Sequence, residues 1–210
     1  MPNPIDLTLP YDSDMPGVTI EIAKTLEQDG WNARTLHLYS HVGTHMDAPL
    51  HFGVTNQSID QIPLTDCMGP AWIVHLPNLP DQYLIEIKDL GDVAEKVQPS
   101  DSLLFRTGWS QYLRQSRYRD GLPRISEELA EWCVTKKIKM LGVEAPSVAD
   151  VNNLPEVTKI HQILLGGEIV IIEGLTNLDK IQQEQVQLIA LPLKIQGGDG
   201  SPARVIALEE

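Results

Sequence analysis

The stretch SHVGTHMDAPLHF, residues 40–52, limits the fold more than any other because it gathers three histidines and an aspartate within eleven positions. His41, His45, Asp47 and His51 fall at i, i+4, i+6 and i+10, so a straight strand would carry all four on one face. At about 3.3 Å per residue, a straight strand would also hold His41 and His45 about 13 Å apart. Two imidazoles that far apart are unable to bind one ion, which needs each nitrogen at about 2 Å.

The chain must therefore bend within this stretch. Pro49 blocks a helix that would continue to the last histidine, and Gly43 is a poor helix former. Gly43 also tolerates a positive φ, so it is the residue that permits a tight kink. We predict that a strand over residues 33–41 ends in this kink, which folds His41, His45 and Asp47 around one point.

Two imidazoles and a carboxylate form a nitrogen and oxygen donor set that suits Zn²⁺ or Mn²⁺. The alternative, a polar patch without a metal, is disfavoured by the local concentration of four groups of this type. His51 follows Pro49, which stiffens its approach. It is either a fourth ligand or a free general base beside the metal, and its distance from the other three favours the base.

Further ligands must come from distant parts of the chain. His161 is the one histidine beyond residue 75, and Glu173 ends the apolar run IVIIE. A carboxylate at the end of a buried strand is costly unless it is paired or bound. A salt bridge is the ordinary interpretation of such a glutamate, but a nearby metal site weakens it. With His161 and Glu173 added, the chain has enough ligands for two ions that share carboxylates.

Hydrophobic periodicity indicates strands mixed with helices, without strict alternation. The predicted helices are 125–138, with Ser126 as N-cap, and 158–166; the predicted strands are 5–9, 33–41, 71–76, 102–106, 139–143, 168–173, 186–193 and 203–208. Residues 10–17 and 196–202 are predicted to be loops. No polar linker divides the chain, so we predict one α/β domain over residues 1–210 around a mixed sheet.

The composition excludes some partners. A formal net charge of −13 argues against nucleic acid or an anionic membrane surface. No apolar run reaches the roughly 18 residues of a membrane span, and the first residues show no signal-peptide pattern, so we expect a cytoplasmic protein. Of the two cysteines, Cys67 and Cys133, the second lies in a helical pattern and is expected to be a buried thiol. His37 and His75, each alone in a predicted strand, are interpreted as structural.

The stretch HVGTHMDAPLH resembles the H-x-G-T-H-x-D-x-P-x-H signature of the cyclase family, metal-dependent hydrolases that include bacterial kynurenine formamidases and isatin hydrolases. Other family blocks are matched in the same order: LFRTGW (104–109), GVEAPSV (142–148), IEGLTNL (172–178) and GDGSPARVIAL (198–208). The resemblance implies a swivelling β/β/α fold, oligomers of two or four chains, and hydrolysis of an amide or lactam C–N bond in a small molecule.

The resemblance also implies roles for particular residues. His41, His45 and Asp47 correspond to ligands of one metal. His161 corresponds to a ligand of a second metal, with Asp47 and Glu173 bridging both ions. His51 matches the proton-transfer residue. Isatin hydrolases carry an amide where this chain has Glu173, which favours the formamidase branch and a two-metal site.

Two positions depart from the formamidase pattern. The early block reads DMPGV, so Met15 stands where kynurenine formamidases usually have a tryptophan that packs on the substrate. Glu144 stands where an aspartate is common. Met15 is thus a candidate substrate-wall residue, and Trp31 or Trp109 could supply an aromatic wall instead. The leading hypothesis is an arylformamidase-like hydrolase; the alternatives are a lactam hydrolase and a metal-binding protein without turnover, against which an unligated base at His51 argues.

Overall fold

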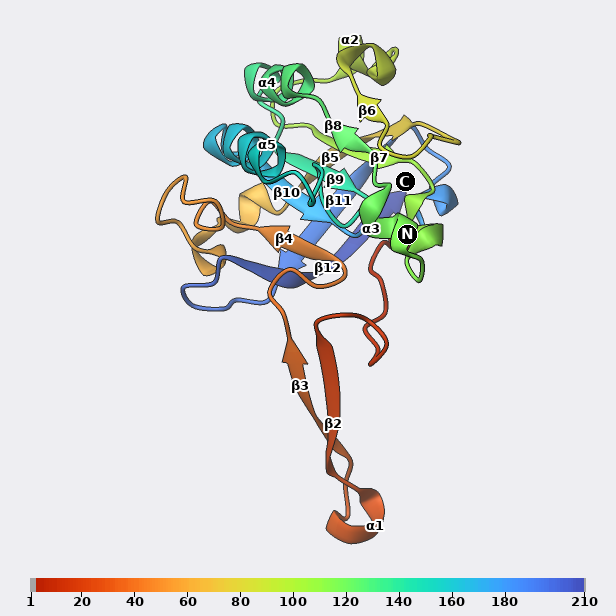
Figure 1. The fold of residues 1–210 in the computed structure, drawn as a ribbon, viewed down its shortest axis with the longest axis vertical. Coiled ribbons are helices and arrows are strands. Elements are labelled where there is room, and N and C mark those ends of the chain that lie inside the picture. Colours follow the sequence, from red (N-terminus) through yellow and green to blue (C-terminus); the bar gives the residue numbers. More distant parts are fainter. Residues whose placement is uncertain (1–2, 210) are drawn as a thin grey trace.

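A mixed eight-stranded sheet forms the body of the protein in the computed structural model, which describes residues 3–209 (Figure 1). Its strands are β1 (Asn3–Asp6), β4 (His45–Asp47), β5 (Met68–His75), β7 (Ser102–Arg106), β9 (Met140–Val143), β10 (Val170–Glu173), β11 (Gln185–Pro192) and β12 (Gly200–Glu209). The strand order is β1-β12-β11-β5-β7-β9-β10-β4. Strand β12 also pairs with β4, which closes every strand except β1 into a ring. The predicted α/β class with a mixed sheet is confirmed.

Strands β5, β7, β9 and β10 are parallel, and β7, β9 and β10 are buried along almost their whole length. Both faces of a parallel sheet are covered, so β7, β9 and β10 are continuous apolar runs rather than alternating ones. In β7, Leu103 and Phe105 face a cluster shared with the helices, while Leu104 faces a second cluster formed by the other strands. Because these strands are buried on both faces, their apolar runs are unbroken, and the predicted strands 102–106 and 139–143 match the bounds of β7 and β9 to within one residue.

Two longer helices, α4 (Glu127–Lys136) and α5 (Leu154–Gly166), pack on one face of this sheet (Figure 1). The side chain of Ser126 accepts a hydrogen bond from the Leu129 amide, so it caps α4 as predicted. Cys133 on α4 is a free buried thiol, as expected, and Cys67 is also free and buried. Helix α5 begins four residues earlier than predicted, because Asn153 caps it with Pro155 in its first turn.

A long hairpin, the arm (residues 18–38), projects from the body (Figure 1). It consists of β2 (Val18–Lys24), the short helix α1 (Leu26–Asp29) and β3 (Ala33–Leu38), and β2 and β3 pair only with each other. Strand β2 was not predicted. The predicted strand 33–41 ends at Leu38 and belongs to the arm, where both of its faces are largely exposed.

The remaining elements are short. They are α2 (Val93–Lys96), α3 (Ser116–Asp120), the paired strands β6 (Leu84–Ile85) and β8 (Arg124–Ile125), and the 3-10 helices η1 (Ile59–Gln61), η2 (Leu64–Asp66), η3 (Ile87–Leu90), η4 (Trp109–Tyr112) and η5 (Leu178–Lys180). Among residues 3–209, no helix is both long and apolar enough to cross a bilayer.

Candidate metal centre

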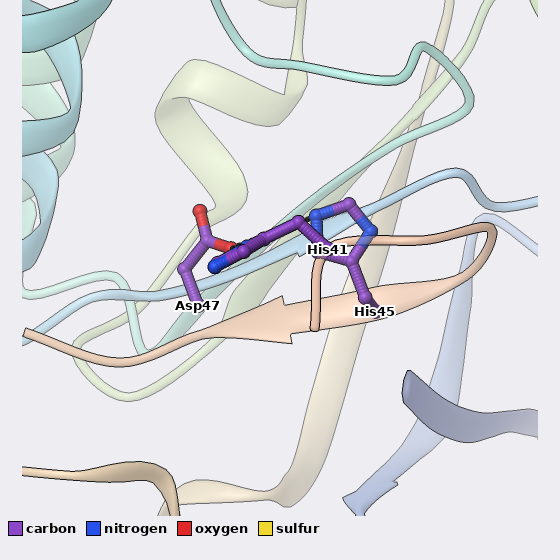
Figure 2. Close-up of side chains that lie close together, drawn as sticks. All are labelled: His41, His45 and Asp47. Carbon is purple, nitrogen blue, oxygen red and sulfur yellow. Dashed lines mark hydrogen bonds and ion pairs between the residues drawn. The ribbon is translucent and has the colours of Figure 1, made fainter. Parts of the chain in front are cut away.

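The turn between the arm and β4 brings His41 back over the strand. Gly43 adopts φ +60°, and a β-carbon there would lie 2.7 Å from the Tyr11 ring, so both backbone and space require glycine. His45 and Asp47 stand two residues apart on one face of β4. Figure 2 shows the three side chains converging, which is the kink that the spacing predicted.

These three side chains form the first candidate ligand group: His41, His45 and Asp47. The Oδ1 atom of Asp47 lies 2.8 Å from His41 Nδ1 and 3.6 Å from His45 Nε2. His45 and Asp47 are buried, and the His41 side chain is 9% exposed. Three donor atoms of the right kind therefore surround one small volume that is shielded from solvent.

The second ligand group is Asp47, His161 and Glu173. Glu173 ends β10 and lies opposite His45 in the pairing of β10 with β4, while His161 comes from α5. His161 Nε2 lies 3.5 Å from Asp47 Oδ2 and 3.3 Å from Glu173 Oε1. The other Glu173 oxygen, Oε2, lies 3.2 Å from His45 Nε2. Each carboxylate therefore presents one oxygen to each group.

Backbone carbonyls fix the tautomers of two of these histidines. His45 Nδ1 lies 2.9 Å from the Gly43 carbonyl oxygen, and His161 Nδ1 lies 2.7 Å from that of Val157. A carbonyl only accepts, so each Nδ1 carries the hydrogen and each Nε2 lone pair points into the site. This is the arrangement by which proteins orient metal-binding imidazoles.

The charges of the centre favour a bound cation. Burial alone would raise the pKa of Glu173, but its contacts with His161 and His45 outweigh burial and lower it, so the carboxylate is ionised. Burial alone would lower the pKa of His45 and of His161, yet contacts with Glu173 and Asp47 raise both. The Oδ2 atom of Asp47 is buried without a hydrogen-bond partner among the described residues. A metal ion would satisfy this atom and replace the protons that the histidines otherwise attract.

His51 lies at the edge of the centre, outside these two groups but within a third possible group that it forms with His41 and Asp199. Its ring stacks on that of His41 with centroids 3.8 Å apart, and its side chain is 24% exposed. Burial lowers the pKa of His51, so its imidazole is neutral near pH 7. The structure thus places beside the ligands a histidine that is able to accept a proton.

A cavity of about 760 Å³ opens over the centre. His41, His45, His51, His161 and Glu173 line it, together with the apolar side chains of Met15, Phe52, Leu113, Tyr118, Val151 and Val157. Met15 is 5% exposed and packs beside Leu9, Val18 and Val42. Its predicted place in the cavity wall is therefore compatible with the structure.

Neither tryptophan considered as a substitute wall lines this cavity in the same chain. Trp109 is 1% exposed and donates its indole N–H to the Tyr118 carbonyl oxygen, and Trp31 is exposed on the arm. His37 is also on the arm, and His75 ends β5 away from the ligands.

Glu144 serves a different purpose from the ligands. Its Oε2 accepts hydrogen bonds from the amides of Thr107, Gly108 and Trp109 and from the Thr107 hydroxyl, which fixes the loop after β7. Burial raises the pKa of Glu144 even against these donors.

Sequence reasoning missed three side chains near the centre. Phe52 stacks on the His161 ring with centroids 4.3 Å apart, and Tyr118 lines the cavity. Asp199 contacts His41 from the loop before β12. Phe52 directly follows the HVGTHMDAPLH stretch, so its position in the sequence could have indicated that it lies near the metal centre. Tyr118 and Asp199 reach the centre only through contacts between distant parts of the chain.

Known proteins resemble this chain in sequence and in fold. Residues 5–150 match the family described as "Putative cyclase". A kynurenine formamidase from Bacillus cereus is 30% identical over 209 residues, covering 96% of this chain and 95% of that protein. One from Salinibacter ruber is 33% identical over 186 residues, covering 86% and 81%. Isatin hydrolase A from Ralstonia solanacearum has the same fold, with a TM-score of 0.88, 24% identity, and coverage of 100% of this chain and 92% of that one.

The fold, the two ligand groups and the cavity above them define a metal-dependent hydrolase. With residues 5–150 matched, the chain belongs to the cyclase family.

Proposed function

We propose that this protein hydrolyses the C–N bond of an arylformamide, as the kynurenine formamidases do according to their name. One observation carries the proposal: Asp47 and Glu173 each present one oxygen to each ligand group, beneath a cavity whose lining is mostly apolar. Such a cavity accepts a flat aromatic body, while the ligand groups lie beside its polar end.

The residues that would hold the metal follow from the two groups. His41, His45 and Asp47 would hold one divalent ion, and His161 and Glu173 would hold a second with Asp47; Zn²⁺ and Mn²⁺ both suit these donors. When bound, such ions lower the pKa of water and polarise a carbonyl oxygen. The two buried carboxylates would offset the charge of the ions.

His51 is proposed to move the proton. Hydrolysis adds the oxygen of water to the formyl carbon, breaks the C–N bond, and leaves formate and an arylamine. The departing nitrogen needs a proton, and the attacking water must lose one. The neutral imidazole of His51, at the cavity edge, is able to take the proton that the water loses and deliver it to the departing nitrogen.

Two other functions fit less well. A lactam hydrolase would share the fold of isatin hydrolase A, but at 24% identity that likeness concerns the fold alone. Glu173 favours a carboxylate-bridged centre over the amide expected of that branch. A metal-binding protein without turnover would have no use for an unligated histidine stacked beside the ligands.

We also propose that the protein is a homodimer or homotetramer, and that the arm joins its chains. An isolated two-stranded hairpin is only marginally stable in water, and the arm exposes Ile22, Trp31 and Leu36, each more than half exposed. A second copy would cover these side chains. Sedimentation of Trp31→Glu beside the wild type tests this: a smaller assembly supports it, and an unchanged one contradicts it.

The remaining features stay predictions. They are a swivelling β/β/α fold, a single cyclase-like hydrolase domain over residues 1–210, and a cytoplasmic location.

A substrate panel tests the function. Purified protein loaded with Zn²⁺ or Mn²⁺ is assayed on N-formylkynurenine, formanilide, an aryl ester and a lactam, with and without chelator. We expect chelator-sensitive release of formate from the two formamides. Preference for the lactam would support the isatin-hydrolase alternative, and metal binding without turnover of any substrate would support the binding protein.

A further inference from the structure

Asp199 lies in the loop between β11 and β12, and the sheet fixes its position. Its carbonyl oxygen accepts a hydrogen bond from the Ala48 amide at 3.0 Å, and the next residue, Gly200, pairs with Asp47 across β12 and β4. The pairing of β12 with β4 therefore holds Asp199 directly beside β4, the strand that carries His45 and Asp47.

One oxygen of Asp199 serves two histidines. Its Oδ2 lies 3.0 Å from His41 Nε2 and 3.5 Å from His51 Nδ1, and the two rings are stacked at an interplanar angle of 24°. The first contact is a hydrogen bond. The second is longer, as contacts of catalytic groups often are before substrate binds. The carboxylate thus lies at the shared edge of the two stacked rings.

Gly200 contributes to this geometry through its lack of a side chain. A β-carbon there would lie 2.5 Å from Cε1 of His41 and 2.9 Å from the Met46 carbonyl oxygen. The His41 ring therefore lies against the backbone of β12, which leaves it little freedom to turn away from Asp199.

We propose that Asp199 is a positioning residue that orients both a metal ligand, His41, and the proton carrier, His51. This inference rests on the proposed function. An N–H from His41 Nε2 to Asp199 leaves the Nδ1 lone pair directed at Asp47, which lies 2.8 Å away in the first ligand group. An N–H from His51 Nδ1 to the same oxygen leaves its Nε2 lone pair for the proton that hydrolysis moves.

The shared oxygen links metal binding to proton transfer. A carboxylate on the far side of a ligand histidine fixes the tautomer and strengthens the imidazole as a donor. Since Asp199 does not line the cavity, its loss affects metal affinity and turnover more than substrate binding.

The test compares Asp199→Ala and Asp199→Asn with Asp92→Asn, a matched control that removes one exposed carboxylate at the start of α2, away from the centre. Zn²⁺ affinity is measured by competition with a chromogenic chelator, and kcat and KM are measured on N-formylkynurenine. For Asp199→Ala we expect Zn²⁺ to bind about 10- to 100-fold more weakly. We also expect a lower kcat with KM within about twofold of the wild type. The Asn oxygen still accepts one N–H, so Asp199→Asn should recover part of the affinity.

Two results would overturn the proposal. One is wild-type Zn²⁺ affinity and kcat in both Asp199 variants. The other is the loss of one whole ion from Asp199→Ala with the remaining affinity unchanged, because Asp199 would then be a ligand in a separate site with His41 and His51. If the wild type binds Zn²⁺ but hydrolyses no formamide, the proposed function fails while the affinity measurements still decide the role of Asp199.

Discussion

Metal binding should stabilise this protein strongly, because its ligands are buried charges. Asp47 and Glu173 are 1% and 4% exposed, and Asp47 Oδ2 has no hydrogen-bond partner among the described residues. Once chelator has removed the ions, protonated His41, His45 and His161 are the cationic groups in contact with these carboxylates, and returning Zn²⁺ replaces those protons. The free energy of unfolding must rise with every ion that binds only the folded chain.

The size of the effect follows from the number of ions. An ion at a hundredfold excess over its Kd contributes about 2.7 kcal/mol. In a chain of this length, each kcal/mol shifts Tm by about 2–4 °C. Two ions should therefore raise Tm by about 10–20 °C, and one ion by about half as much.

Glu173→Gln separates the two ions. Its neutral amide bridges two cations poorly, so the second ion should be lost while the first, which depends on His41, His45 and Asp47, remains. Calorimetry of chelated and Zn²⁺-loaded protein should show about half the wild-type rise in Tm. Comparing the rise within each variant cancels any change in metal-free stability, and Glu131→Gln, on the exposed side of α4, is the matched control. An equal rise in Glu173→Gln and wild type would refute the two-ion reasoning, as would no rise in the wild type.

Two further substitutions test the residues around the ligands. His51→Ala should keep near-normal metal content and lose about 10²- to 10⁴-fold in rate, as measured by elemental analysis and kcat; loss of metal would instead make His51 a ligand. Met15→Trp should raise kcat/KM on N-formylkynurenine by about 2- to 10-fold through aromatic stacking, without a gain on a small aliphatic formamide. Equal effects on both substrates, or none, would show that Met15 does not face the substrate.

The sequence predicted the parts of the fold that depend on local pattern. Continuous apolar runs marked β7, β9 and β10, and the spacing of His41, His45 and Asp47 around Gly43 required the kink that the structure has. The spacing alone left the role of His51 open. Residue type already named His161 and Glu173 as further candidate ligands, but their assignment to a second metal came from the family resemblance, because those residues meet only through the packing of α5 on the sheet.

The features that escaped prediction depend on partners far away in the chain. Strand β2 belongs to an arm whose two faces are both largely exposed, so its pattern has no buried side to reveal it. Residues 33–41 alternate like a half-buried strand, yet β3 pairs only with β2. Asp199 reaches His41 because β12 closes the sheet on β4, a contact between residues 158 positions apart.

Anomalous X-ray scattering at the zinc edge, from crystals grown with Zn²⁺, tests the carboxylate-bridged centre most directly. We predict two peaks per chain, one among His41, His45 and Asp47 and the other among Asp47, His161 and Glu173. A single peak, or peaks away from these residues, would contradict this prediction.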